Sequence, residues 1–469
     1  MNGGAGRLGP MTPSRRIFAG LSIGNFLVLL DTSILNVALP DVQRDLGSSS
    51  TALPWAAVAY TISFAGLLLA AGAVSDRFGA RKVYAGALAA FAALSLACAA
   101  APSIGALIGG RVLLGAAAAC MVPSSVALLA GLFEHPGARA RAIGVWAAVT
   151  SSGLLLGPML GGLLVTAGGW RLVFLVNPSI AALALLLSRK LANPRPAQVR
   201  PLDLPGIALS VVALVALTYG LIDGGTNGWG RPIPWVSVAV AVLAGLALAV
   251  VERRVEHPVL PPSLVAHRDL DASIVAAAVA TLVFYGVLYS LTLWLQGERG
   301  WTPLQTGLAF VPMTLPMCVL PIFAGRLVAR FGARRVILVG LAFDVLAGAL
   351  LLGATSGASI GWVLAAQVPL VLASTTVIPA ATADVAVHAP AEVAGAAQGA
   401  LNAGRQAGSA LGVAILGPLA ALPHVGLVLV GISVLAVLVA FAGRRPTPRS
   451  DQDRPQSVLA TVNRWLTKA

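Results

Sequence analysis

Two charged side chains, Asp31 and Arg111, lie within long apolar stretches. A carboxyl group in apolar surroundings can bind and release a proton, and a nearby guanidinium group responds to that change of charge. Charges inside a bilayer are costly, so they usually mark a proton or ion pathway. Asp31 and Arg111 are therefore the candidate proton-coupling pair, and a permanent structural salt bridge is the alternative reading.

The elements that must position this pair are long helices. Of the 469 residues, 58% are hydrophobic and only 10% are charged, whereas soluble domains carry about 25% charged residues. A helical crossing of a bilayer needs about 20 apolar residues, and the chain supplies such runs almost from end to end. The runs are continuous and do not alternate, which excludes a β-barrel pattern. We predict an all-α polytopic membrane protein.

Connectors with Pro, Gly or charged residues divide the apolar runs into fourteen predicted crossings. The crossings lie near 17–39, 54–74, 83–101, 103–130, 140–165, 170–189, 205–223, 233–252, 272–297, 304–325, 335–355, 360–385, 395–419 and 422–443. Asp31 lies about nine residues before the end of the first crossing, and Arg111 about nine residues after the start of the fourth. Because these crossings run in opposite directions, both residues are predicted to lie roughly 13 Å from the outer side of the membrane, at 1.5 Å per residue. We expect their side chains to meet.

An internal repeat divides the chain. GAVSDRFGARKV at 72–83 recurs as GRLVARFGARRV at 325–336. Two related halves with a substrate site between them are typical of secondary transporters. We predict a cytoplasmic N-terminus at 1–16, a six-helix half at 17–189, a linker with two extra transmembrane helices at 190–271, a second six-helix half at 272–443, and a cytoplasmic basic tail at 444–469.

Of the 31 Lys and Arg residues behind the net charge of +14, 25 fall at the N-terminus, in the C-terminal tail or in alternate loops. The exceptions in the other loops are Arg44, Arg171, Arg231 and Arg299. This bias follows the positive-inside rule and predicts that both termini are cytoplasmic. We therefore expect a lipid bilayer as partner and no nucleic acid.

The chain shows no signal for a cofactor, a metal or an enzymatic activity. The three cysteines are isolated within apolar runs, and no GxxxxGK[ST] loop for nucleotide binding occurs. An ion gradient is then the expected energy source, with protons as the default ion.

The loop that contains Gly72, Asp76, Arg77, Gly79 and Arg81 resembles the signature of the major facilitator superfamily. Four further stretches resemble its fourteen-helix drug:proton antiporter branch: LDTSILNVALP at 30–40, GLLLGPMLGG at 153–162, GWRLVFLVNP at 169–178 and AGAAQGALNAGRQAGSALGVA at 394–414. The resemblance implies the major facilitator fold, with two six-helix halves plus two inserted central helices.

The same resemblance implies a function. It predicts a monomeric secondary transporter in the bacterial inner membrane that exports hydrophobic or amphipathic drugs in exchange for protons, by alternating access. An exporter of one endogenous natural product and a metabolite:proton symporter are the transport alternatives. A membrane sensor or scaffold on a transporter fold is a further alternative, because a fold does not establish a function.

Two motifs are candidates for conformational roles. Asp76 and its basic neighbours are predicted to form a gating latch on the cytoplasmic side, although a pure topology signal would need only the basic residues. The second copy of the loop has Ala329 at the position of Asp76. The antiporter-motif residues are Gly153, Gly157, Pro158, Gly161 and Gly162, whose small ridge and bend are alternatively ordinary tight packing.

The remaining candidates concern the substrate and a second charge pair. Polar and aromatic positions on helical faces give the candidate cavity residues Asn25, Asn36, Tyr285, Tyr289 and Gln296. Hydrogen bonding between helices is the alternative for the asparagines. Asp344 and Arg405 are the charges deep in the second half, and they are a candidate second pair.

Overall fold

The computed structural model describes residues 13–133, 136–189, 203–255, 268–354, 359–389, 394–419 and 421–442. Every element within these ranges is helical. The predicted terminal segments 1–16 and 444–469 lie wholly or largely outside the described residues.

The first six helices follow the predicted crossings closely. They are α1 (Pro13–Leu46), α2 (Leu53–Phe78), α3 (Ala80–Ala99), α4 (Ile104–Leu132), α5 (Pro136–Gly168) and α6 (Arg171–Ser188). Two helices come next, α7 (Leu204–Asn227) and α8 (Pro232–Val251). We call α1 to α6 the N-terminal group.

The remaining helices form the C-terminal group. It comprises α10 (Arg268–Leu293), the π-helix η1 (Trp294–Glu298), α11 (Pro303–Ala309), α12 (Val311–Thr314), the 3₁₀ helix η2 (Leu315–Cys318), α13 (Leu320–Phe331), α14 (Ala333–Leu352), α15 (Ile360–His388), α16 (Ala394–Leu416) and α17 (Leu422–Ala442).

The predicted number of fourteen crossings is not confirmed. Among the described residues, eleven helices are long and apolar enough to cross a membrane, or twelve when the bent α2 is included as one span. The predicted crossing at 304–325 is wrong as a single helix, because it is broken into α11, α12, η2 and α13. A proline stands at the first or second position of each of these short helices, at 303, 312, 316 and 321. A proline has no backbone N–H with which to continue a preceding helix, which explains the breaks. The segment at 395–419 forms α16, which is not among the helices that are long and apolar enough to cross a membrane.

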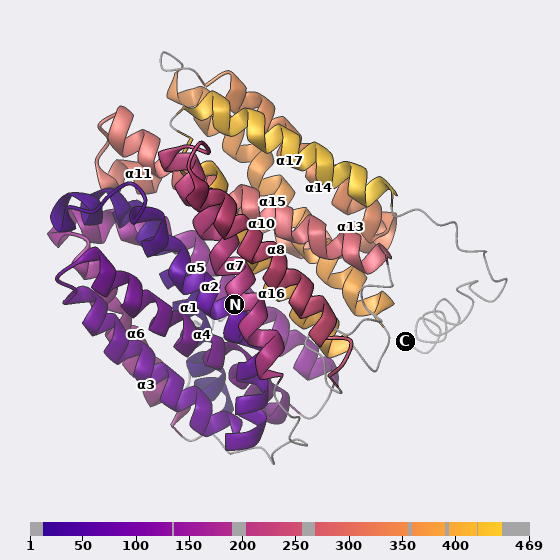
Figure 1. Cartoon of the computed structure of the whole chain (residues 1–469). Helices are drawn as coiled ribbons and strands as arrows, with labels where there is room; N and C mark the ends of the chain where they lie inside the picture. The colour runs from indigo at the N-terminus through magenta and orange to yellow at the C-terminus, as the bar shows by residue number, and fades with distance from the viewer. Residues whose placement is uncertain are drawn as a thin grey trace, which may run out of the picture.

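The two groups repeat one packing scheme. In the N-terminal group α1 packs on α5, and α3 packs on α4 and α6. In the C-terminal group α10 packs on α16, and α14 packs on α15 and α17. Figure 1 shows the first group in indigo and purple on one side and the second in orange and yellow on the other. The sequence repeat is therefore accompanied by a structural repeat.

The junction within each copy of the repeated loop depends on a glycine. Gly79 separates α2 from α3 with a φ of 91°, and Gly332 separates α13 from α14 with a φ of 82°. Side chains other than glycine are strained in this left-handed region, so both turns require this residue type.

Helices α7 and α8 lie across the front of the two groups in Figure 1. Helix α7 packs on α8, on α2 of the N-terminal group and on α16 of the C-terminal group. The outward face of α8 exposes large apolar side chains such as Trp235, Leu243 and Leu246. Such a face suits contact with lipid tails.

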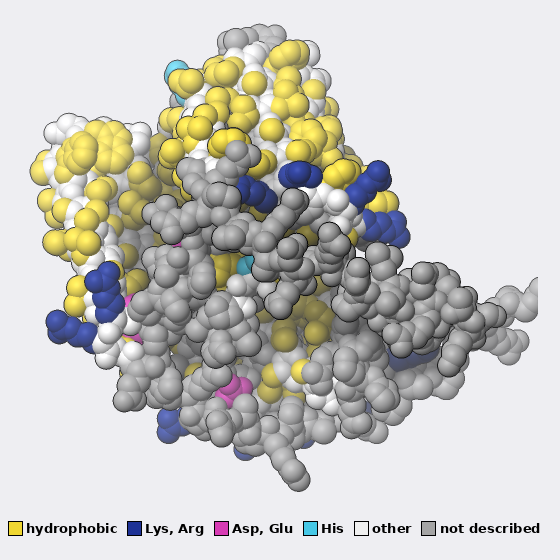
Figure 2. Space-filling model, turned by 90° about the vertical axis from the view of Figure 1, so that its right-hand side faces the viewer, with side chains coloured by type: hydrophobic (Ala, Val, Ile, Leu, Met, Phe, Trp, Pro, Cys, Tyr) yellow, Lys and Arg dark blue, Asp and Glu magenta, His cyan; other side chains and the backbone are white. Residues whose placement is uncertain are grey.

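Figure 2 shows hydrophobic side chains over the upper part of the visible surface, with Lys and Arg gathered along the lower margin of this apolar region. An apolar belt that is bordered by basic side chains matches the surface expected of a protein in a bilayer.

Candidate functional site

Asp31 and Arg111 form the central ion pair of the N-terminal group. Asp31 lies in the middle of α1 and Arg111 lies in α4, and an ion pair joins Arg111 Nη1 to Asp31 Oδ2. Both side chains are at most 1% exposed. The structure thus brings together the two charges whose depths in the sequence predicted a meeting.

Two residues that the sequence did not single out complete the site. The Nδ2 atom of Asn177 in α6 donates to Asp31 Oδ1 at 2.9 Å and to Ser95 Oγ of α3 at 3.2 Å. Asp31, Ser95 and Asn177 are all fully buried. Asn177 stands in the quoted stretch 169–178, directly before Pro178, but neither its type nor its spacing indicated which helix it would face.

Arg111 is also fixed by a backbone carbonyl and an aromatic ring. Its Nε atom donates to the carbonyl oxygen of Ala56 at 3.2 Å, and its guanidinium carbon lies 4.5 Å from the centre of the Tyr60 ring. The Tyr60 hydroxyl donates to the carbonyl oxygen of Val28 at 3.0 Å, which holds the ring in place. A cation over an aromatic face is favourable, and more so in dry surroundings.

One nitrogen of Arg111 remains available. The Nη2 atom has no hydrogen-bond partner among the described residues, although it is buried. An unpaired donor at a buried position is costly, so its environment is where a water or a ligand would bind.

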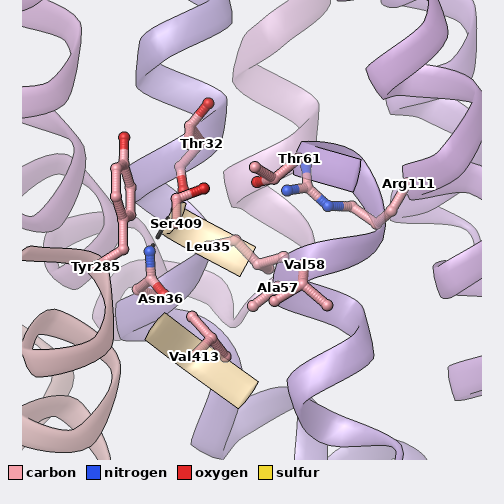
Figure 3. Close-up of a pocket in the computed structure, with 10 residues that line it drawn as sticks. All are labelled: Thr32, Leu35, Asn36, Ala57, Val58, Thr61, Arg111, Tyr285, Ser409 and Val413. Atoms are coloured by element: carbon pink, nitrogen blue, oxygen red, sulfur yellow. Dashed lines mark hydrogen bonds between the residues drawn. The ribbon is translucent and has the colours of Figure 1, made fainter. Parts of the chain in front are cut away.

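A small cavity adjoins Arg111 between the two groups. Figure 3 shows the side chains that surround it, which come from α1, α2 and α4 on one side and from α10 and α16 on the other. The lining residues are Thr32, Leu35, Asn36, Ala57, Val58, Thr61, Arg111, Tyr285, Ser409 and Val413. The cavity volume is about 10 Å³, which is enough for about one water molecule. A drug-sized ligand does not fit in this conformation.

The five candidate cavity residues lie in four different environments. Asn36 and Tyr285 line the central cavity. Tyr289 lines a second cavity of about 320 Å³ between α1, α2, α7, α10 and the segment that follows α16. Asn25 is buried and donates within its own helix, to the carbonyl oxygen of Leu21 at 3.0 Å. Gln296 bonds across to α1.

The two groups meet tightly at the end of the molecule where α11 begins, which we call the Pro303 end. Gln296 Nε2 donates to the carbonyl oxygen of Val37 at 2.8 Å. Helix α11 packs on α5 so closely that a Cβ atom on Gly162 would lie 3.0 Å from the Cα atom of Leu304. Figure 1 shows α11 beside the indigo and purple helices at this end.

The family of this chain follows from comparison with known proteins. The family model for the Major Facilitator Superfamily matches residues 21–413 and 273–467. The chain belongs to the Major Facilitator Superfamily.

Related major facilitator proteins have been named for antibiotic resistance and export. The puromycin resistance protein of Streptomyces alboniger is 39% identical over 413 residues, which cover 86% of this chain and 82% of that protein. The cephamycin export protein of Amycolatopsis lactamdurans is 36% identical over 435 residues, which cover 89% of each chain.

A solved major facilitator fold is also similar. The crystal structure of a POT family transporter in complex with 5-aminolevulinic acid superposes with a TM-score of 0.68 and 14% sequence identity. The superposed region covers 91% of this chain and 96% of the POT family transporter. At this level of identity the likeness shows the fold alone.

In this major facilitator protein the two copies of the signature loop hold equivalent helix ends. Arg81 Nη2 donates to the carbonyl oxygen of Arg189 at 3.1 Å, just after α6. Arg334, its counterpart in the second copy, donates to the carbonyl oxygens of Ala440 at 2.8 Å and Phe441 at 2.9 Å, at the end of α17. We call this end of the molecule the Arg81 end.

The other signature residues show no latch contact in this conformation. Asp76 is half-buried and takes part in no ion pair within the described part of the chain. The Arg77 guanidinium lies 5.7 Å from the centre of the Phe78 ring, and a Cβ atom on Gly72 would meet nothing within 4 Å. The gating role of this loop stays a prediction.

The glycines of the antiporter motif, Gly153, Gly157 and Gly161 of α5, pack against α1. A Cβ atom on Gly153 would lie 2.8 Å from the backbone nitrogen of Leu30, and one on Gly161 would lie 2.6 Å from the carbonyl oxygen of Ile34. Gly157 faces Ser33, and Pro158 faces Gly307 of α11. The spacing thus allows α5 to contact α1 with one side and α11 with the other.

The candidate second charge pair is not formed. Asp344 is fully buried in α14, and Arg405 in α16 has its Nη1 atom 3.4 Å from Asn402 Oδ1. No ion pair joins the two in the described residues, and Asp344 Oδ2 and Arg405 Nε lack hydrogen-bond partners there. Helix α14 packs mainly on α15 and α17, which explains the separation.

Proposed function

We propose that this protein exports amphipathic drugs or an antibiotic natural product in exchange for protons, by alternate opening of the N-terminal and C-terminal groups. The observation that carries the proposal is the buried Asp31–Arg111 ion pair, whose arginine lines the cavity between the groups. The names of the puromycin resistance and cephamycin export relatives support export as the direction.

The proton acts on the ion pair. When a proton binds Asp31, the carboxyl group becomes neutral and Arg111 keeps its charge without a counter-charge. An unpaired charge in a dry interior is unstable, so rearrangement of α1 and α4 or contact with a ligand becomes favourable. Arg111 can respond through Nη2, which already lacks a partner beside the cavity.

We infer that the Arg81 end faces the cytoplasm of a bacterial cell, where both termini also lie, and that the Pro303 end faces outward. The basic residues of the repeated loops support this orientation. The structure then represents a state whose outer end is closed, and the cavity must enlarge before a substrate enters from the inside. We expect one chain to be the transport unit.

Proton release in everted membrane vesicles tests the proposal. Vesicles that contain the protein are loaded with a pH-sensitive dye and acidified inside, and puromycin or a lipophilic cation is added. Antiport predicts that the compound dissipates the acid gradient. We expect Asp31→Asn to abolish this response in protein that stays folded, with a lower melting temperature because the buried Arg111 loses its counter-charge.

A matched control lies on the same helix. Asp45 is 46% exposed and pairs with Arg171 near the end of α1, away from the central cavity. Asp45→Asn should therefore keep the response. Retained proton-coupled export in Asp31→Asn would remove Asp31 from the mechanism, and accumulation of the compound inside intact cells would show symport.

A further inference from the structure

We infer that Asn177 is a positioning residue for the proton-binding carboxyl group, because its amide can hold Asp31 in both protonation states. This inference rests on the proposed proton coupling at Asp31. It assigns a role to a residue on α6, a helix that does not line the central cavity.

The two carboxyl oxygens of Asp31 have different partners. Oδ2 pairs with Arg111, whereas Oδ1 accepts from Asn177 Nδ2 at 2.9 Å. Asn177 belongs to a helix that packs on both α1 and α3. Departure of Arg111 would therefore leave Asp31 with one neutral partner that does not depend on the ion pair.

The amide of Asn177 has an unused acceptor. Its Oδ1 atom is buried and has no partner among the described residues. An ionised carboxylate only accepts hydrogen bonds, whereas a protonated carboxyl group also has one O–H to donate. Rotation of the amide by about half a turn places Oδ1 where Nδ2 now lies, because the two ends of an amide have nearly the same shape.

Ser95 fits either orientation of the amide. Its hydroxyl now accepts from Asn177 Nδ2 at 3.2 Å. After rotation the same hydroxyl can donate to Oδ1, since a serine hydroxyl is both a donor and an acceptor. The Asn177–Ser95 contact therefore survives the change, and it keeps the amide beside Asp31.

Other titratable groups around Asp31 come from three neighbouring helices. They are Arg111 of α4, Tyr60 of α2 and Cys98 of α3, and Tyr285 of α10 lies across the cavity. The described side chains of α5 include no titratable group. Arg111 is the charged member of this set. Asn177 is the neighbour that can either donate a hydrogen bond to Asp31 or accept one from it.

Loss of the Asn177 amide should make Asp31 bind its proton more tightly. The bond from Nδ2 to the ionised carboxylate is charge-assisted and stronger than the bond to the neutral acid. Its removal destabilises the ionised form more than the protonated form, so Asp31 should take up its proton at a higher pH. We expect a shift of up to about one pH unit, or tenfold in proton affinity.

Labelling with a hydrophobic carbodiimide reads this change without transport. The reagent modifies protonated carboxyl groups, and purified protein in lipid nanodiscs is labelled across a pH series in an Asp344→Asn background. Asp31→Asn defines the signal from Asp31. We expect Asn177→Leu, which keeps the branched shape and the number of side-chain heavy atoms but not the amide, to raise the pH midpoint of labelling.

Three further variants separate positioning from packing. Asn177→Gln keeps an amide and should return the midpoint toward that of the unmodified chain. Ser95→Ala removes only the outer contact, and it should shift the midpoint by less than Asn177→Leu. Asn177→Ser, a smaller polar change, should also raise the midpoint and serves if the leucine variant does not fold.

The results separate this inference from the proposed function. An unchanged midpoint in folded Asn177→Leu and Asn177→Ser, with labelling lost in Asp31→Asn, would overturn the role of Asn177. Proton-coupled export that persists in Asp31→Asn would instead overturn the proposed coupling, whatever the labelling midpoints are.

Discussion

Gln296 of η1 donates a hydrogen bond to the carbonyl oxygen of Val37 in α1 at 2.8 Å, and so joins the two helix groups at the Pro303 end. Its partner is a backbone atom of α1, six residues beyond Asp31 and nine residues before the helix ends at Leu46. Opening of the groups at that end would break this bond, so its strength should contribute to the balance between conformations.

Gln296→Leu should favour opening at the Pro303 end. A hydrogen bond of this kind contributes about 0.5–1.5 kcal/mol, so the open population should rise by roughly two- to tenfold. Spin labels on α5 and α11 would measure the distance distribution between the groups. Thr292→Val is the matched control, because the Thr292 hydroxyl bonds only within α10. Equal distributions in both variants would contradict a gating role for Gln296.

Gly307→Ala should also disrupt closure, for a steric reason. A Cβ atom at this position would lie 3.3 Å from the Cα atom of Met159 and closer still to the Pro158 carbonyl group. Overpacking of this kind costs about 1–3 kcal/mol. We expect slower export and wider separation of α5 from α11, measured by transport rate and the same spin labels. Gly109→Ala, whose Cβ atom meets nothing within 4 Å, should change neither.

Removal of one partner of the central ion pair should cost more than removal of both charges. Arg111→Ala leaves the buried Asp31 carboxylate without its counter-charge, a loss of about 3–5 kcal/mol. The double variant Asp31→Asn with Arg111→Gln leaves no unpaired charge and should unfold at a higher temperature than Arg111→Ala. Thermal unfolding in detergent provides the comparison. A double variant less stable than Arg111→Ala would show that charge imbalance is not the cause.

Arg111→Lys should not restore transport, although it keeps the positive charge. Lysine lacks the planar group that bonds to the Ala56 carbonyl oxygen and lies over the Tyr60 ring. We expect a folded protein with at least a tenfold lower export rate, measured with puromycin in everted vesicles. Full activity in this variant would reduce the role of Arg111 to its charge.

Arg334→Gln should destabilise the C-terminal group. Arg334 holds two carbonyl oxygens at the end of α17, and a partly exposed contact of this type is worth about 1 kcal/mol. We expect a lower melting temperature, whereas Arg335→Gln at the exposed neighbouring position should have little effect. Arg81→Gln should act in the same way on the N-terminal group, through the carbonyl oxygen of Arg189.

The sequence by itself determined the class of protein, the ends of most helices and the central ion pair. Apolar runs of bilayer length fix helix positions, because each helix satisfies its own backbone hydrogen bonds and needs no partner to form them. Asp31 and Arg111 were found because a charge within such a run is conspicuous, and because their depths could be counted along two helices.

Only the tertiary structure decided which side chains meet across helices. Asn177 and Ser95 are ordinary polar residues in the sequence, and their contact with Asp31 depends on the rotation and packing of α3 and α6. Asp344 and Arg405 have similar depths, yet α14 and α16 hold them apart. The contact of α11 with the Gly162 surface of α5 is likewise a result of packing. Depth along a helix is a local property, whereas the direction of a side chain toward a partner is set by the whole bundle.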